Sequence, residues 1–498
     1  MIKDNKIMIG KAGDKEIYLN PAQMNRHGFI AGASGTGKTV TLKVIAESLS
    51  ELGVPTVIAD IKGDLTGMIV PGDEDGIRER WQSMGLESYD VRKYPVHFFD
   101  IYQKAGHPIR AVMQQMGPMM LSRIMDLTDA QQGVLNIIFR VAQDMELDII
   151  DLKDLQAMTL YVGEHYKEYT SKYGNIAKQS VGAIQRKLLE LETEGGDKFF
   201  GEPALDINDW MVTENGLGVM NMIECDELFQ HPLLYSTFML WMLDELYDRL
   251  PEVGDVEKPK IAFFFDEAHL LFDGAPKQLL QQIEQTVRLI RSKGVCVFFI
   301  TQNPMDIPNS VLAQLSHRIQ HSLRAYTPSE IKNVKSAANA FRANPEFDTF
   351  EMITALKTGQ ALVSALDEDG APTIVQKTKI LPPHSSMKVA DPNRVAYAIE
   401  TDSIYGKYER VMDAQSAYED LPEIYAAEEE MKAKAEAAKQ AEKEEEARRK
   451  AEERAAAKKA NEKTWEEKLA RKASNKLQNE LINMGVRSAK KLLKNLLK

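Results

Sequence analysis

The sequence predicts an α/β fold with a mostly parallel sheet, a helical insertion and a long C-terminal helix. Continuous apolar runs at residues 54–61, 261–265 and 295–301 are typical of parallel strands that are buried on both faces. Segments with helical periodicity separate these runs, as expected for strands joined by crossover helices. From about residue 426 the composition changes to Ala, Glu, Lys and Arg, which favours a long solvated helix.

The bulk composition narrows the class of protein. The chain has 498 residues, of which 44% are hydrophobic and 27% charged, so it can form several domains with a large core. A net charge of -12 excludes a uniformly basic coat but is compatible with a basic channel inside an acidic body. Cys225 and Cys296 lack metal-site spacing, and no apolar run approaches the about 18 residues of a membrane span. We therefore expect a cytoplasmic protein without a transmembrane segment.

Residues 1–112 are expected to form the N-terminal half of the α/β core. Short strands between residues 6 and 32 lead into a glycine-rich loop. A helix should follow at 39–52, because apolar residues recur there and Gly53 ends the pattern. Strands are then predicted at 54–61 and 94–101. This strand–helix–strand order marks the start of the sheet.

The remaining chain divides into four further parts. Residues 113–210 are expected to be a mainly helical insertion, and residues 211–390 the C-terminal half of the core. Residues 391–425 are expected to be a linker, and residues 426–498 a charged, Ala/Glu/Lys-rich helical tail. Within the C-terminal half, strands and helices are predicted at 216–224, 233–250, 261–265, 276–292, 295–301, 318–323, 360–366 and 373–381.

Residues 32–39 match the phosphate-binding motif G-x-x-x-x-G-K-[ST] in full. The glycines let backbone N–H groups surround phosphate oxygens, and the helix N-terminus favours an anion. Lys38 is placed to reach the β- and γ-phosphates of ATP, and the Thr39 hydroxyl to ligate Mg²⁺. The alternative is an ordinary glycine-rich turn, but a strand before and a helix after the motif favour the P-loop. The predicted nucleotide-binding residues are Gly32, Ala33, Ser34, Gly35, Thr36, Gly37, Lys38 and Thr39.

A second acidic site follows the apolar run IAFFF. Asp266 and Glu267 come directly after it, where α/β sheets bind ligands. Asp266 is expected to hold Mg²⁺, usually through a water molecule. Glu267 is the candidate base that orients and polarises the water that attacks ATP. The alternative is a buried strand with an acidic cap.

Two further segments are candidates for the same edge of the sheet. Gln302 lies just past the apolar strand at 295–301, where a neutral amide can contact the γ-phosphate or the attacking water. Asp60, Lys62 and Asp64 gather at the end of the run at 54–61 and are expected to support the Mg²⁺ site or to face a central pore. The alternative for Gln302 is an ordinary polar turn. The alternative for the segment from Asp60 to Asp64 is a charged turn.

These motifs together resemble the HerA–FtsK superfamily of P-loop ATPases. The P-loop, DIKGD, FFDEAHLLF and ITQNP occur in the superfamily's order, and VRLIRSKGVCVFFITQNPMDIPNSVLAQLSHRI resembles the HerA branch. QSVGAIQRKLLELE and GGDKFFGEPALDI resemble a subgroup of HerA-like bacterial ATPases of unassigned function. The resemblance covers about residues 5–385. It implies a RecA-like P-loop NTPase core, a hexameric ring with ATP at the subunit interfaces, and movement of a polymer, usually double-stranded DNA, through the pore.

One departure and one open question accompany the resemblance. HerA proteins normally carry a β-barrel domain before the P-loop, whereas 31 residues precede Gly32 here, so we expect a core without that barrel. A ring ATPase also needs an arginine that neutralises charge on the γ-phosphate. The superfamily pattern favours Arg291 and Arg318, acting within a subunit or on its neighbour. Surface or helix-end charges are the alternative for both.

The leading hypothesis is a homo-oligomeric, Mg²⁺-dependent ATPase of the HerA type that moves along DNA or remodels a DNA-bound complex. The runner-up is a nucleotide-gated scaffold whose helical tail recruits a protein partner, and a third hypothesis is a motor that acts on protein. The last residues, SAKKLLKNLLK, are basic and amphipathic. They suit nucleic acid, an acidic protein face or a membrane surface, or form only a frayed helical tail.

Overall fold

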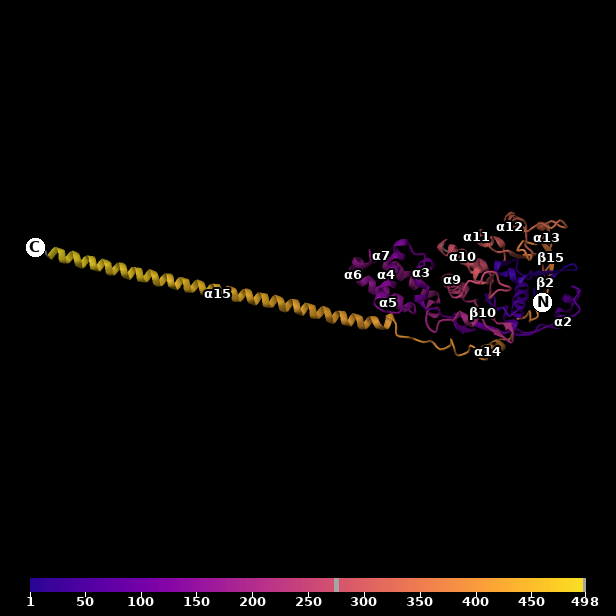
Figure 1. Cartoon of the computed structure of the whole chain (residues 1–498), viewed down its shortest axis with the longest axis horizontal. Coiled ribbons are helices and arrows are strands. Elements are labelled where there is room, and N and C mark those ends of the chain that lie inside the picture. The colour runs from indigo at the N-terminus through magenta and orange to yellow at the C-terminus, as the bar shows by residue number, and fades with distance from the viewer. Residues whose placement is uncertain (273–276, 496–498) are drawn as a thin grey trace. The chain divides into compact units, whose positions relative to one another are not determined.

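The computed structural model describes residues 1–272 and 277–495 of the chain (Figure 1). These residues belong to two compact units, Met1–Asp420 and Leu421–Lys498. The larger unit contains the sheet and the helical insertion. The smaller unit consists of most of one long helix.

A single large sheet organises the larger unit. Its strand order is β1-β2-β15-β14-β13-β4-β12-β11-β5-β10-β6-β7, with β3 paired to β2. Along this order, the pairs from β13 to β7 are parallel and those from β13 to β1 are antiparallel, as is β2 with β3. This confirms the predicted mostly parallel sheet. The strands are β1 (Ile2–Lys3), β2 (Lys6–Ala12), β3 (Lys15–Leu19), β4 (Gly28–Ala31), β5 (Thr56–Asp60), β6 (Val96–Asp100), β7 (His107–Pro108), β10 (Met220–Glu224), β11 (Ile261–Phe265), β12 (Val295–Thr301), β13 (His317–Gln320), β14 (Gln360–Ser364) and β15 (Gln376–Ile380).

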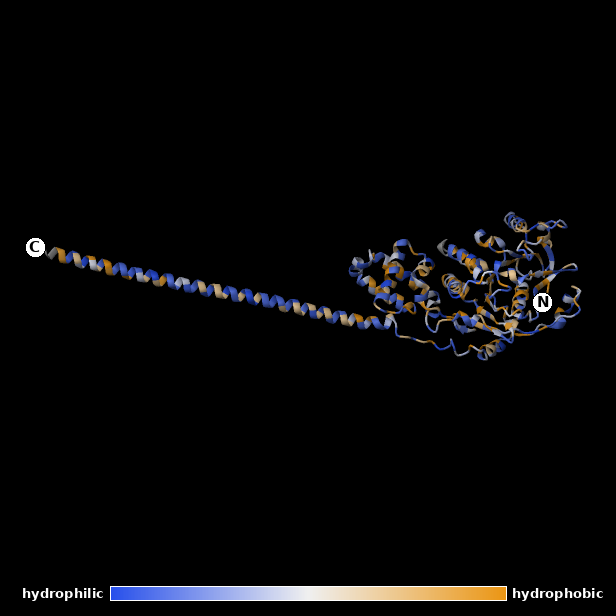
Figure 2. Ribbon diagram, viewed as in Figure 1, coloured by the Kyte–Doolittle hydropathy of each residue, from blue (hydrophilic) through white to orange (hydrophobic). Residues whose placement is uncertain are grey.

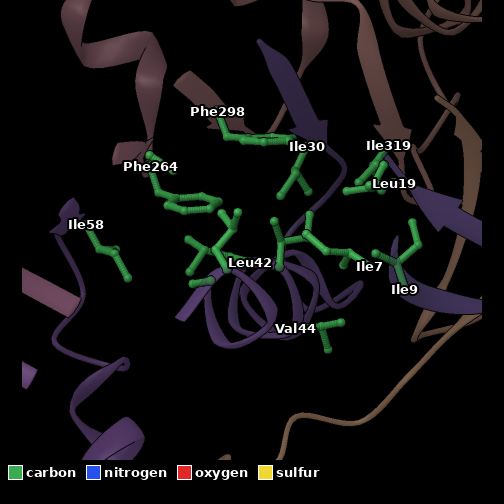
Figure 3. Close-up of a cluster of buried hydrophobic side chains, with 14 of the residues drawn as sticks. Ile7, Ile9, Leu19, Ile30, Leu42, Val44, Ile58, Phe264, Phe298 and Ile319 are labelled. Carbon is green, nitrogen blue, oxygen red and sulfur yellow. The ribbon is translucent and has the colours of Figure 1, made fainter. Parts of the chain in front are cut away.

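Both faces of the central strands are buried, because alternate side chains of a strand point to opposite sides. On one face, Ile58, Phe264 and Phe298 pack with Leu42 of helix α1 (Lys38–Glu51) in the main core cluster (Figure 3). The rings of Phe264 and Phe298 stack at 5.4 Å between centroids. On the other face, the neighbouring residue Phe263 makes an edge contact with the ring of Trp210. Burial on both sides explains why these strands are continuous apolar runs in the sequence.

Helices and one short pair of strands, β8 (Thr213–Glu214) and β9 (Leu217–Gly218), complete the core. The predicted helix at 276–292 is observed as α10 (Lys277–Leu289), which continues into a 3₁₀ turn, Ile290–Lys293. Its expected first residue, Pro276, lies outside the described residues. The remaining core elements are α2 (Glu74–Gln82), α9 (Pro232–Arg249), α11 (Asn309–Leu312), α12 (Pro328–Asn339) and α13 (Thr349–Ala355).

The segment between β7 and β8 is helical, as the sequence predicts. Helix starts are defined by local capping: the Thr128 N–H donates to Gln131 Oε1 at 2.9 Å, and Asp151 and Asp154 form a second capping box. Apolar side chains such as Ile138 and Ile184 are fully buried. The helices are α3 (Met113–Ile124), α4 (Asp129–Asp144), α5 (Leu152–Glu164), α6 (Tyr166–Tyr173), α7 (Lys178–Leu191) and α8 (Asp197–Phe199).

The stretch that the sequence predicts as a linker, residues 391–425, is packed within the larger unit as far as Asp420. It begins with helix α14 (Pro392–Glu400). The Tyr408 side chain is fully buried. The backbone carbonyl of Tyr408 accepts a hydrogen bond from Arg110 Nη1 at 2.8 Å. Ser416 Oγ donates to Asp154 Oδ1 at 2.6 Å. These contacts join residues far apart in the sequence, so the stretch predicted as a linker packs against the core as far as Asp420.

Helix α15 (Ala417–Asn495) begins before the predicted boundary at 426 and forms the charged tail. Figure 2 shows mostly hydrophilic colour over its middle part, with hydrophobic residues recurring towards its C-terminal end. Glutamates pair with Lys or Arg one turn away, for example Lys450 with Glu446 at 2.6 Å. Across the described residues, we find no helix that is both long enough and apolar enough to cross a membrane.

Candidate nucleotide site

The P-loop connects the end of β4 to the start of α1, so the motif lies at the carboxyl edge of the parallel sheet. At two positions of the loop the backbone can accommodate only glycine. A Cβ at Gly32 would lie 2.5 Å from the His321 Cβ, and Gly37 has φ +112°, which side chains rarely adopt. The loop thus leaves an open backbone cradle at a helix N-terminus, the arrangement that holds a phosphate group.

Two side chains of the motif face this cradle region. Lys38 Nζ donates to the Gly32 carbonyl at 2.7 Å and to the Ala33 carbonyl at 3.3 Å. Burial lowers the pKa of Lys38 from its ordinary value. Thr39 Oγ1 donates to Asp64 Oδ2 at 3.4 Å. The Lys38 amine rests on loop carbonyls, and the Thr39 hydroxyl lies beside a carboxylate oxygen of the kind that Mg²⁺ prefers.

The end of β11 carries Asp266 and Glu267, both nearly buried. Burial raises the pKa of Asp266 to about 6. Glu267 adopts φ 45° and ψ 46°, a left-handed backbone conformation that is strained for a residue with a side chain. Strain of this kind is retained where the surrounding structure imposes it, and it turns the Glu267 carboxylate toward the neighbouring loops.

Lys62 and Gln302 hold the Glu267 carboxylate from two sides. Lys62 Nζ lies 2.6 Å from Glu267 Oε1. Gln302 Nε2 donates to both Glu267 oxygens, at 3.2 Å and 3.3 Å, and Ser34 Oγ of the P-loop donates to Gln302 Oε1 at 3.3 Å. Burial raises the pKa of Glu267, but Lys62, together with Gln302 and His269, outweighs this effect, so the net pKa is lowered. Gln302 therefore joins the P-loop to the carboxylate that follows β11.

Asp60 shapes the loop that supplies Lys62. Its Oδ1 accepts from the Lys62 N–H at 3.2 Å and its Oδ2 from the Leu65 N–H at 3.0 Å. Burial raises the pKa of Asp60 to about 6. Lys62 and Asp64 of this loop reach Glu267 and Thr39, respectively. Lys62 and Asp64 thus contact the residue after β11 and the P-loop, respectively, while Asp60 holds the loop that carries them.

Two residues near the site were missed by the sequence reasoning. His321 follows β13; Thr41 Oγ1 and His321 Nε2 are 2.8 Å apart, and the His321 N–H donates to the Ala31 carbonyl at 2.7 Å. Burial lowers the pKa of His321 to about 4, so a neutral ring supports the P-loop from behind. No local sequence signal identifies this role, because it depends on which strand lies beside β4.

Arg324 is the second missed residue. It is exposed and lines a pocket of about 360 Å³ together with Ala33, Ser34 and Gln302. It lies just past the end of β13, at the same edge of the sheet as the P-loop. The rule that identified Gln302, a polar residue following a parallel strand, applies equally to Arg324.

The structure does not bring the two predicted arginines to the site of their own chain. Arg291 is exposed in the turn that precedes β12, hence at the amino edge of the sheet, opposite the P-loop. Arg318 lies at the level of Phe29 in β4, with its guanidinium 5.9 Å from the centre of that ring. Arg318 Nη1 also donates to the Ala340 carbonyl at 2.8 Å. Arg318 therefore makes packing contacts within its own chain, while Arg291 is free to face another molecule.

The fold and this arrangement define a P-loop ATPase. A family model described as helicase HerA-like C-terminal matches residues 5–497. The chain belongs to this family, which agrees with the resemblance stated from its motifs.

Two curated relatives are both named DNA double-strand break repair helicase HerA. The protein of Saccharolobus solfataricus is 20% identical over 374 residues, covering 72% of this chain and 66% of the relative. That of Sulfolobus acidocaldarius is 20% identical over 395 residues, covering 78% of this chain and 70% of the relative. The chain therefore spans about two thirds of the length of each relative.

Solved structures of a bacterial conjugative coupling protein, TrwB, are similar in fold. An unbound form of TrwBdeltaN70 has a TM-score of 0.53 at 14% identity and covers 78% of this chain and 92% of that chain. TrwB in complex with a non-hydrolysable GTP analogue has a TM-score of 0.52 at 13% identity, covering 78% and 93%. At such identities the likeness concerns the fold alone.

Proposed function

We propose that this protein is a Mg²⁺-dependent ATP hydrolase of the HerA type that assembles into a ring and moves along DNA. The observation that carries the proposal is a chain of hydrogen bonds that leads from the P-loop through an amide to one carboxylate. Glu267 from β11, Gln302 from β12 and Ser34 from the P-loop form a continuous hydrogen-bonded path. Such a path links the phosphate cradle to a side chain able to accept a proton from water.

ATP binding is assigned to the P-loop backbone and to Lys38. The amine now held by the Gly32 and Ala33 carbonyls is within reach of a phosphate placed in the cradle. Thr39 and Asp266 are the proposed holders of Mg²⁺, with Asp64 beside Thr39. The fit rests on the donors, since a hydroxyl and carboxylates are hard oxygen ligands. The bound ion would supply neutralisation of charge on the phosphate oxygens.

Glu267 is proposed as the base, and Gln302 as the residue that orients the attacking water. The strained backbone at Glu267 and its two polar partners hold the carboxylate in one direction, which is what an oriented proton acceptor requires. Gln302 contacts both the P-loop and Glu267, so it is placed to respond to a γ-phosphate.

The ring is supported by the position of Arg291. An exposed arginine at the edge of the sheet opposite the P-loop reaches a nucleotide only in a neighbouring subunit. We propose that Arg291 acts on the nucleotide of the neighbouring subunit. We propose that Arg324, which lines a pocket with Ser34, acts within its own subunit. We propose a homo-hexamer with ATP at each interface, in which repeated head-to-tail contacts of this kind close into a ring.

DNA is the proposed polymer, and the cytoplasm the proposed location. The two curated relatives are named as DNA repair helicases, and α7 in the insertion exposes Lys178 and Arg186, which suit contacts to phosphates without reading bases. Cys225 and Cys296 are free, buried thiols, in keeping with a reducing compartment.

A second candidate is a nucleotide-gated scaffold or protein-remodelling ATPase. The observation that favours it is the ion pair between Lys62 and Glu267, because a carboxylate engaged by an ammonium is a weak base. Slow turnover would then serve as a switch, and helix α15 would recruit a protein partner.

Duplex DNA separates the two candidates. The HerA-type proposal predicts that DNA raises the ATPase rate and that this stimulation falls steeply between about 50 and about 200 mM salt. Particle mass should be measured with ATP, with DNA and with both, and should correspond to a hexamer in at least one of these states. If DNA changes neither the rate nor the particle mass, the DNA motor is excluded and the scaffold remains.

A further inference from the structure

The distal part of α15 exposes large apolar side chains. Between residues 476 and 493 six such side chains are each at least 60% exposed: Leu477, Leu481, Ile482, Met484, Leu492 and Leu493. Exposed apolar surface of this extent marks an interaction site rather than a solvated helix.

These side chains share one side of the helix. At about 100° per residue, Leu477, Leu481 and Met484 project next to one another, and Ile482 and Leu493 continue the same surface. The apolar arc covers about 200° of the helix circumference. The remaining arc contains basic residues and one acidic residue: Lys476, Arg487, Lys490, Lys491 and Glu480.

The preceding part of the helix has a different character. Between residues 426 and 467 both signs of charge alternate, and pairs such as Lys434–Glu430 and Lys450–Glu446 lie one turn apart. Residues 426–475 thus form an ion-paired spacer of about 75 Å. From residue 468 to the end, nine Lys and Arg residues accompany a single acidic residue, in a chain whose net charge is -12.

We propose that residues 476–493 are an anchor that lies in the surface of an anionic lipid bilayer. Such a surface takes up a broad apolar face below its headgroups and attracts cations beside them, which matches both arcs of the segment. Anionic lipid is favoured over zwitterionic lipid because the polar arc is basic.

Each of the two alternative partners, a second copy of the helix and duplex DNA, matches only one arc of the segment. A second copy of the helix would bury a seam of two positions in seven, narrower than the observed arc, and would bring like charges together beside it. Duplex DNA would use the cations but leave the apolar arc in water. The anchor is independent of the nucleotide site, so its test is separate from that of the proposed function.

The test uses the full-length protein in vesicle flotation, with equal parts phosphatidylglycerol and phosphatidylcholine, or with phosphatidylcholine alone. The first variant reverses three cations: R487E, K490E and K491E. Its control reverses three cations of the spacer: K458E, K459E and K463E. The second variant replaces Leu481, Ile482 and Leu492 by Gln, and its control replaces Met431, Trp465 and Leu469, which are similarly exposed, by Gln.

We expect the unchanged protein to float with anionic vesicles, and both anchor variants to partition at least about tenfold more weakly. Both controls should stay within about twofold of the unchanged protein, with the same helical circular dichroism. The proposal is overturned if the protein does not float with anionic vesicles, or if pure phosphatidylcholine binds it equally. It is also overturned if the anchor variants lose only duplex-DNA binding, or if the Gln variant only lowers the particle mass in sedimentation.

Discussion

Lys62 Nζ lies 2.6 Å from Oε1 of Glu267, joining the loop after β5 to the end of β11. These residues are distant in the sequence and meet because β5 and β11 are neighbours in the sheet. Burial raises the pKa of the Glu267 carboxylate, and Lys62 is the main partner that lowers it again. The proposed base thus depends on a lysine outside the P-loop.

Removing this lysine should slow turnover without preventing nucleotide binding. In Lys62→Ala the buried Glu267 carboxylate loses its cation, so protonation becomes easier and fewer molecules have a competent base. We expect kcat to fall about tenfold or more, with KM for ATP within about threefold. Lys62→Arg should recover part of the rate. A kcat for Lys62→Ala equal to that of the unchanged protein would show that the pair has no part in catalysis.

Mixing two inactive variants should reveal which arginine acts on a neighbour. A ring of Glu267→Gln and Arg291→Ala subunits contains interfaces with an intact site and an intact Arg291. We expect recovery of up to about a quarter of the wild-type rate, the share of such interfaces in randomly assembled rings. Recovery is measured as ATPase activity after co-assembly.

Arg324→Ala is the matched comparison in the mixing experiment. An arginine that acts within its own subunit cannot be supplied by a neighbour, so mixing with Glu267→Gln should recover nothing. Arg318→Ala should instead lower the melting temperature, because its guanidinium bonds the Ala340 carbonyl and packs on Phe29. Recovery with Arg324→Ala but not with Arg291→Ala would reverse the two assignments.

Glu47 should make stability depend on pH. This fully buried carboxylate of α1 accepts from the His384 N–H at 2.7 Å and from the Ser385 N–H at 3.2 Å. Burial raises the pKa of Glu47 to about 7 from 4.5. An acid with a raised pKa contributes stability that is full below its unfolded pKa and is lost as pH rises through the folded pKa.

The window for this effect is therefore between pH about 4.5 and about 7. The melting temperature of the unchanged protein should fall more from pH 5 to pH 8 than that of Glu47→Gln, by the equivalent of about 3 kcal/mol at most. Asp60 and Glu224, also buried with raised pKa values, remain in both proteins and cancel in the comparison. Parallel curves for the two proteins would remove Glu47 from this role.

Truncation after Asp420 should leave the nucleotide site intact. The larger unit ends at that residue and contains the P-loop, Glu267 and Gln302. We expect basal ATPase activity within about twofold of the full chain, since the residues proposed for binding and hydrolysis all belong to the larger unit. The same truncation should abolish vesicle flotation. Complete loss of ATPase activity would mean that the helix is needed for ring assembly.

The elements of the fold were predictable where local pattern decides them. Apolar runs located the strands β5, β11 and β12, and the P-loop motif located the start of α1, because buried parallel strands and phosphate loops have sequence signatures. The packed stretch before α15 was predicted as a linker, since nothing local announces that Tyr408 is buried against distant residues.

Side-chain partners across the sheet were the part that the sequence did not supply. The contacts of Lys62 with Glu267, of Thr41 with His321 and of Glu47 with Ser385 each depend on the order of strands and on loop paths. The sequence placed Lys62 near the site, but only the strand order determines that its amine meets the candidate base.

Glu267→Gln tests the central claim most directly. The substitution keeps the size and most contacts of the side chain but removes its ability to accept a proton. Binding of a labelled ATP analogue and steady-state hydrolysis should be measured on the same preparation, with Lys38→Ala as the binding-defective control. We predict that Glu267→Gln binds within about threefold of the unchanged protein and hydrolyses ATP at least about a hundredfold more slowly. Brisk hydrolysis by Glu267→Gln would contradict the assignment of Glu267 as the base.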